Sequence, residues 1–83
     1  MEPRPTILFT QSGCVDSRKV RSWLNARHVA FTERNVTGDA DAANELLATG
    51  YFATPLLVSG ESVVIGFRPT SIAAALNLVE PPE

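Results

Sequence analysis

Cys14 is the only cysteine of this 83-residue chain, and its surroundings favour a reactive thiol. The apolar run from Ile7 to Phe9 ends in a short polar turn that contains Gly13, and an amphipathic segment begins after Cys14. A thiol where a strand gives way to a helix lies at the helix N-terminus, whose N–H groups stabilise a thiolate. We therefore predict that Cys14 is a nucleophile with a pKa below the usual value of about 8.5. The alternative is a small, buried, apolar side chain.

Ser17 and Asp16 are the neighbours expected to set the reactivity of this thiol. Ser17 follows Cys14 by one helical turn, so its hydroxyl can donate a hydrogen bond to the thiolate; an ordinary polar residue of the first turn is an equal alternative. A hydrogen bond from a first-turn N–H to a charged sulfur contributes about 1.5–3 kcal/mol, which outweighs the helix dipole at about 0.3–1 kcal/mol. The negative charge of Asp16 opposes both effects.

Ser17 also limits what the thiol can do. When a protein with two cysteines reduces a disulfide, the first cysteine attacks the substrate and the second displaces the product. A serine cannot perform the second step. A mixed disulfide at Cys14 therefore persists until an external thiol arrives.

The composition argues against several classes of function. A net charge of -2 argues against nucleic acid as a partner. One cysteine and one histidine cannot build an internal disulfide or a structural zinc site within one chain. No apolar run approaches the roughly 20 residues of a membrane span, and residues 1–5 do not form a signal peptide. We expect a single cytoplasmic domain over residues 1–83, without a bound metal and monomeric.

Hydrophobic periodicity and turn residues predict seven elements in the order β-α-β-α-β-β-α. In chain order they are strand 6–10, helix 15–28, strand 29–36, helix 40–49, strand 54–58, strand 62–65 and helix 69–78. A strand–helix–strand connection makes the first two strands parallel, and the short turn at 59–61 makes the last two an antiparallel hairpin. The expected fold is α/β, a mixed four-stranded sheet with helices on both faces.

Three features of the sequence together resemble the glutaredoxins, which have the thioredoxin fold. They are this order of elements, the Cys-x-x-Ser turn from Cys14 to Ser17, and Thr54–Pro55 at the start of the third strand. Gly66–Pro69 after the hairpin and Gly50–Phe52 ahead of the Thr-Pro pair are similar to the NrdH-type redoxins of that group. The resemblance covers nearly the whole chain. It implies a thiol–disulfide oxidoreductase that passes electrons to a protein disulfide, such as that of ribonucleotide reductase.

The resemblance also implies the electron source and the residues of the site. Thioredoxin reductase would supply electrons from NADPH as a partner, with no cofactor bound to this chain. Cys14 would be the attacking thiolate, Ser17 would mark the resolving position, and Thr54 would face the thiol across a cis bond to Pro55. The implied substrate contacts are Gln11, Gly13, Val15, Asp16, Thr54, Pro55, Gly66, Phe67 and Arg68.

The chain departs from the family pattern in ways that leave alternatives open. NrdH-type redoxins carry Cys-x-x-Cys, so Ser17 is either a natural monothiol variant or a replacement that traps the mixed disulfide. Gln11 stands where glutaredoxins often have a basic residue, Ala53 replaces the threonine of Thr-Val-Pro, and the glycine-glycine-acidic stretch that holds glutathione is absent. The alternatives are a glutathione-dependent monothiol glutaredoxin, a binding module of the same fold, and a dimer that holds an iron–sulfur cluster through Cys14.

Overall fold

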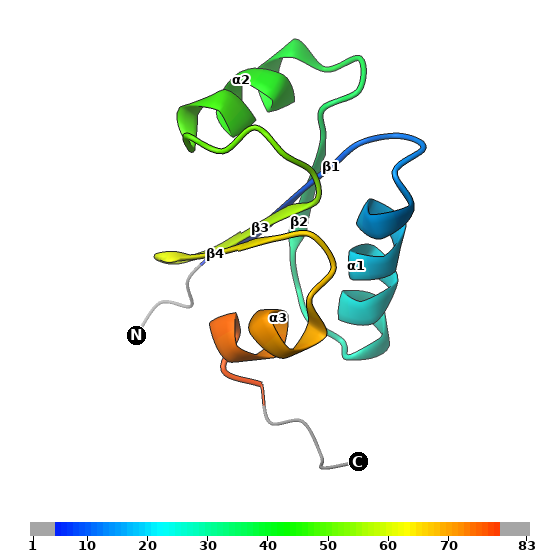
Figure 1. The fold of residues 1–83 in the computed structure, drawn as a ribbon, viewed down its shortest axis with the longest axis vertical. Helices are drawn as coiled ribbons and strands as arrows, with labels where there is room; N and C mark the ends of the chain where they lie inside the picture. The colour runs from blue at the N-terminus through cyan, green and yellow to red at the C-terminus, as the bar shows by residue number, and fades with distance from the viewer. Residues whose placement is uncertain (1–4, 79–83) are drawn as a thin grey trace.

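The computed structural model describes residues 5–78, which form seven elements in the predicted order (Figure 1). They are β1 (Thr6–Thr10), α1 (Val15–Ala26), β2 (Thr32–Asn35), α2 (Ala40–Ala48), β3 (Leu56–Ser59), β4 (Ser62–Ile65) and α3 (Pro69–Ala75). None of these helices is long and apolar enough to cross a bilayer.

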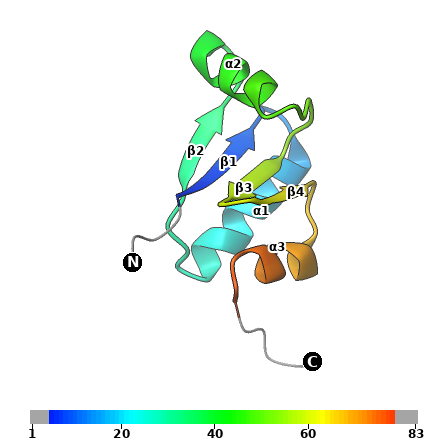
Figure 2. The same cartoon turned by 90° about the vertical axis from the view of Figure 1, so that its left-hand side faces the viewer.

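The four strands form one mixed sheet in the order β2-β1-β3-β4, as Figure 2 shows. β1 runs parallel to β2 and antiparallel to β3, and β3 and β4 form the antiparallel hairpin. In this register Leu8 of β1 lies opposite Glu33 of β2 on one side and Leu57 of β3 on the other. The predicted sheet is confirmed, and with it the thioredoxin-like fold.

Helices cover both faces of the sheet, with α1 and α3 on one face and α2 on the other (Figure 1). Successive residues of a strand point to opposite faces, so each central strand supplies both cores. Leu8 and Leu57 pack in the cluster that includes residues of α1 and α3, whereas Phe9 and Leu56 pack with Leu46 of α2. The continuous apolar run in β1 is therefore the pattern of a strand buried on both faces.

Two helices end earlier than predicted. Each is closed by a residue with positive φ, a position where the sequence usually has glycine, and here that residue is not glycine. α1 ends at Ala26 and not at His28, which has a φ of +57°. The N–H groups of His28 and Val29 bond to the carbonyls of Asn25 and Leu24, a Schellman closure of the helix. That closure uses the Val29 N–H group, so the predicted strand 29–36 shortens to Thr32–Asn35.

α3 ends in the same way. It stops at Ala75 and not at residue 78, and Asn77 has a φ of +56°. The N–H groups of Asn77 and Leu78 bond to the carbonyls of Ala74 and Ala73. α2 ends at Ala48, one residue before the predicted end, which is the usual uncertainty of a helix boundary.

The third strand begins two residues later than predicted. Pro55 has no N–H group for a strand ladder, and the pairing with β1 and β4 starts at Leu56. The Pro55 carbonyl instead accepts a hydrogen bond from the Gly66 N–H group, 2.9 Å away, just after β4. Thr54 and Pro55 therefore form a separate segment at the end of the sheet, where β1 gives way to α1.

Candidate active site

Cys14 is the N-cap residue of α1, the position that the sequence predicted for the thiol. Its backbone is extended, and its Sγ accepts a hydrogen bond from the Ser17 N–H group at 3.4 Å. The Cys14 N–H group bonds back to the Gln11 carbonyl at 3.1 Å, which closes the turn. Gly13 within this turn has a φ of +79°, a left-handed conformation that glycine adopts without strain. The turn therefore presents the sulfur to the free N–H groups of the helix.

The pKa of the Cys14 thiol lies below its usual value, in the predicted direction. The largest cause is the hydrogen bond from the Ser17 hydroxyl, followed by the one from the Ser17 N–H group. The Asp16 N–H group and the Thr54 hydroxyl lower the pKa further, and burial opposes all of them. The opposition that was expected from the Asp16 carboxylate thus comes from burial, and Asp16 contributes through its backbone.

Ser17 is fully buried, which distinguishes it from an ordinary polar residue at the start of a helix. Its Oγ accepts a hydrogen bond from the Gln11 N–H group at 3.3 Å. A hydroxyl has one proton to donate, and the bond from Gln11 leaves that proton available for the sulfur. The structure therefore favours Ser17 as a donor to the thiolate over the alternative of a solvated side chain.

Thr54 lies on the other side of the thiol and follows the arrangement that the resemblance implied. The Thr54–Pro55 peptide bond is cis, and Pro55 is buried. The Thr54 Oγ1 donates to the Gln11 Oε1 at 3.1 Å and also lowers the pKa of Cys14. Gln11 thus contacts both hydroxyls that stabilise the thiolate, Ser17 through its backbone and Thr54 through its side chain.

A polar cluster that we did not predict connects the turn before Cys14 to the end of β2. The Ser12 N–H group donates to the Thr37 Oγ1 at 3.0 Å, and the Asn35 Nδ2 donates to the Ser12 Oγ at 3.2 Å. The Thr37 N–H group donates to the Asn35 Oδ1 at 2.8 Å, which closes the cluster. β1 and β2 are parallel, so their C-terminal ends meet at one edge. The predicted parallel pairing was the signal that could have placed Asn35 near Ser12.

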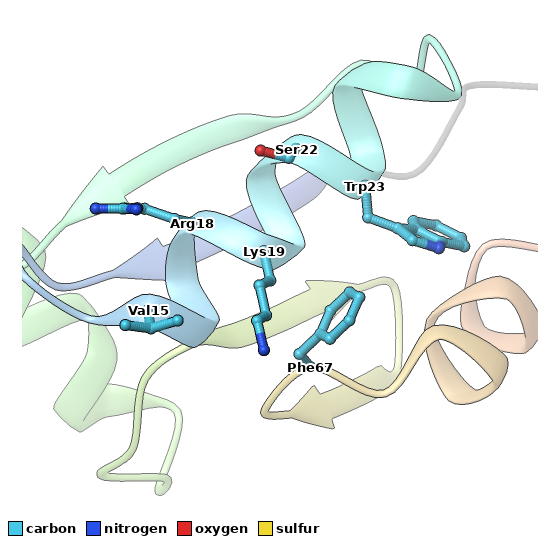
Figure 3. A pocket seen from close by; sticks show the side chains of 6 residues that line it. All are labelled: Val15, Arg18, Lys19, Ser22, Trp23 and Phe67. Atoms are coloured by element: carbon cyan, nitrogen blue, oxygen red, sulfur yellow. The ribbon is translucent and has the colours of Figure 1, made fainter.

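Apolar side chains are exposed around the thiol. Val15, the residue after Cys14, is 58% exposed, and Phe52 in the loop before Thr54 is 75% exposed. Tyr51 beside it is 42% exposed, so neither side chain is buried in the core. Val15 also lines a pocket of about 570 Å³ together with Phe67, as Figure 3 shows. Exposed apolar side chains beside a thiolate suit contact with another protein.

Of the other predicted substrate contacts, Gly66 and Arg68 differ in how they relate to the turn of Cys14. Gly66 joins the site indirectly, through its hydrogen bond to Pro55. Arg68 is the N-cap residue of α3 and lines a smaller pocket with Ser71 beside β4. No hydrogen bond or ion pair within residues 5–78 joins Arg68 to the turn of Cys14, and its contact with substrate stays a prediction. Within the same residues, no group of three His, Cys, Asp or Glu side chains could hold a metal.

Comparison with known sequences shows the family of this chain. The glutaredoxin family model matches residues 6–64. The glutaredoxin-like protein NrdH of Salmonella typhimurium is 31% identical over 65 residues, which cover 78% of this chain and 80% of that protein. NrdH of Lactococcus lactis is 24% identical over 66 residues, which cover 80% of this chain and 92% of the relative.

Solved structures agree with the sequences. The thioredoxin-like protein BC3987 superposes with a TM-score of 0.79 at 32% identity, covering 86% of this chain and 99% of that one. The glutaredoxin-like NrdH-redoxin of Escherichia coli superposes with a TM-score of 0.72 at 26% identity, covering 94% and 99%. This chain therefore belongs to the glutaredoxin family of thiol–disulfide oxidoreductases and is a redoxin of the NrdH type.

Proposed function

We propose that this chain is a monothiol redoxin that forms a mixed disulfide with protein substrates and depends on an external thiol to complete the cycle. The main support for this proposal is the contact between Cys14 and Ser17. Ser17 stabilises the thiolate through two hydrogen bonds, yet it fills the resolving position with a hydroxyl. The arrangement supports attack on a disulfide and provides no second thiol to release the product.

The proposed reaction has two balanced steps. In the first, the Cys14 thiolate attacks one sulfur of the substrate disulfide; a Cys14–substrate disulfide forms, and the other substrate sulfur leaves as a thiolate. In the second, an external thiolate attacks and regenerates Cys14. Thiolates with a pKa near the ambient pH are the best attacking groups, because a lower pKa reduces nucleophilicity and a higher one reduces the thiolate fraction. The lowered pKa of Cys14 favours the first step.

The proposed substrate is a protein disulfide, such as that of ribonucleotide reductase, with thioredoxin reductase and NADPH as the electron source. The support is the similarity to the NrdH proteins and two exposed apolar residues, Val15 directly after Cys14 and Phe52 in the loop that leads to Thr54. Thr54 lies where its backbone can pair with an extended substrate chain. Glutathione is a second candidate for the external thiol, because a site with one cysteine requires one.

NADPH consumption tests the proposal. The chain and its Ser17→Cys variant are each supplied with a disulfide substrate and either thioredoxin reductase or glutathione with glutathione reductase. We expect Ser17→Cys to turn over with thioredoxin reductase, since it restores the second thiol. Turnover of the unaltered chain with glutathione alone would identify glutathione as the external thiol. A Cys14→Ser variant is the matched control and should be inactive with both systems.

One result would contradict the proposed function. If neither chain consumes NADPH with either reductase, and no mixed disulfide accumulates at Cys14, the protein does not exchange disulfides. It would then be a binding module of this fold.

A further inference from the structure

The pocket beside the thiol combines an apolar lining with positive charge. It begins at Val15, the residue after Cys14, and continues along α1 to Trp23, with Phe67 on the opposite side (Figure 3). The ammonium group of Lys19 lies 6.0 Å from the centre of the Phe67 ring. Figure 3 shows Lys19 reaching toward Phe67, whereas Arg18 points away from that ring. Lys19 is thus the central cation of this pocket, and Arg18 forms its outer border.

Two other arginines among residues 5–78 form ion pairs, and the cations at this pocket do not. Arg21, further along α1, donates to both carboxylate oxygens of Glu33, and Arg34 on β2 forms a similar pair with Glu45. Within residues 5–78, neither Arg18 nor Lys19 has a carboxylate partner. The chain as a whole carries a net charge of -2, so these unpaired cations are a local feature.

We propose that this pocket binds a segment of the protein substrate that carries an acidic and an apolar side chain close to its reactive cysteine. The proposal rests on the proposed function, because the substrate must first be held at Cys14. The unpaired Lys19 and Arg18 complement a carboxylate, and Val15 and Phe67 provide the apolar contact. The chemistry therefore selects among protein disulfides by the residues that flank them.

The geometry sets the position of the acidic residue. Lys19 lies five residues beyond Cys14 on α1, about 7.5 Å along the axis at roughly 1.5 Å per residue. An extended peptide covers about 3.3 Å per residue. The acidic residue should therefore stand two or three positions from the substrate cysteine. A pocket of about 570 Å³ is large enough for side chains of such a segment.

A single-turnover reaction tests the pocket without any reductase. Peptides with one cysteine are activated as mixed disulfides with 5-thio-2-nitrobenzoate. The Cys14 thiolate attacks the peptide sulfur, the Cys14–peptide disulfide forms, and the coloured nitrobenzoate thiolate leaves. One peptide series carries Glu and Leu two and three positions from the cysteine, on either side, and its control carries Gln and Leu. The ratio of the Glu rate to the Gln rate is the readout, because the thiolate fraction of Cys14 cancels.

The variants separate the pocket from general charge effects. Lys19→Gln should lower this ratio about 1.4- to 5-fold, the range of one exposed ion pair, and Arg18→Gln should lower it less. Arg34→Gln removes the same charge from the side of the sheet that faces α2 and should leave the ratio unchanged. Val15→Gln should slow both peptides, whereas Leu47→Gln on α2, with a similar exposure of 55%, should not. Added salt should weaken the preference for Glu.

Specific results would overturn the docking proposal. Equal rates for the Glu and Gln peptides, or an equal loss in Lys19→Gln and Arg34→Gln, would overturn the docking proposal. The same reaction with the glutathione derivative tests a small anionic thiol, and a Lys19-dependent rate above that of every peptide would also overturn it. A small neutral derivative, 2-hydroxyethyl, reports on Cys14 alone. If that derivative does not react, the proposed function fails as well, whereas a normal rate confines the failure to the pocket.

Discussion

The Thr54 Oγ1 donates its hydrogen bond to the Gln11 Oε1 at 3.1 Å, which joins the two loops that border Cys14. The same hydroxyl lowers the pKa of the Cys14 thiol. One proton cannot serve both acceptors fully, so Gln11 and the thiolate compete for it. Gln11 is therefore more than a neutral substitute for the basic residue that glutaredoxins often have there.

This competition predicts opposite effects for two substitutions. Thr54→Val removes the donor and should raise the pKa of Cys14. Gln11→Leu removes the competing acceptor but keeps the backbone bond to Ser17, so it should lower that pKa. Titration of thiolate absorbance measures both. Equal directions of change in the two variants would show that the Thr54 proton is not shared.

Ser17→Ala should raise the pKa of Cys14 more than any other substitution near the thiol. The Ser17 hydroxyl is the largest cause of the lowered pKa, and alanine keeps only the N–H group. At neutral pH the rate of mixed-disulfide formation should fall about two- to tenfold, because part of the lost thiolate fraction is offset by greater nucleophilicity.

The pH dependence of that rate gives the sign of the effect. The rate should rise with pH and level off once Cys14 is ionised, with a midpoint below the usual thiol value of about 8.5. In Ser17→Ala the midpoint should move to higher pH, and the plateau should rise, because a thiolate of higher pKa is more nucleophilic. Urea unfolding is the control, since the Gln11 N–H group loses its acceptor in this variant. An unmoved midpoint in a folded variant would contradict the role of Ser17.

The sequence predicted the parts of the fold and site that depend on local pattern. Cys14 at the start of α1, the two-faced burial of Leu8 and Phe9 and the order of elements all follow from hydrophobic periodicity and turn residues. The helix ends did not follow, because His28 and Asn77 adopt the positive φ that glycine usually marks. Asparagine and histidine adopt this conformation less often than glycine does, so they are weaker signals of a helix end.

Contacts between distant segments were the other limit. Gln11 and Thr54 are 43 residues apart, and their hydrogen bond depends on how the two loops meet. Lys19 and Phe67 are also far apart in the sequence, and the packing of the β4–α3 segment against α1 places them side by side. Such placements depend on the packed sheet and not on either segment alone.

Thr37→Val should destabilise the fold by about 0.5–1.5 kcal/mol, the usual contribution of one hydrogen bond. It removes the acceptor of the Ser12 N–H group while keeping the shape of the side chain. Urea unfolding measures the loss. A matched variant, Thr32→Val, changes an exposed threonine at the start of β2 and should cost little. If both variants are equally stable, the polar cluster does not hold the turn.

The ion pair at Glu33 predicts a specific loss of stability in acid. Arg21 is the main cause that lowers the pKa of Glu33, and the Thr10 hydroxyl adds to it at 2.7 Å, whereas burial opposes them. Because the folded pKa lies below the unfolded value of about 4.3, the stabilisation is complete above that value. It is lost as the pH falls through the folded pKa.

Glu33→Gln isolates this effect, because its amide oxygen can still accept from the buried Thr10 hydroxyl. At neutral pH the variant should be less stable by about 0.2–1 kcal/mol, since the pair with Arg21 is partly exposed. The difference in unfolding free energy should shrink as the pH falls below about 4.3 and should also shrink with added salt. A difference that stays constant from neutral to acid pH would assign it to packing. Because Thr10 directly precedes Gln11, the loss of this pair in acid should also loosen the turn that holds Cys14.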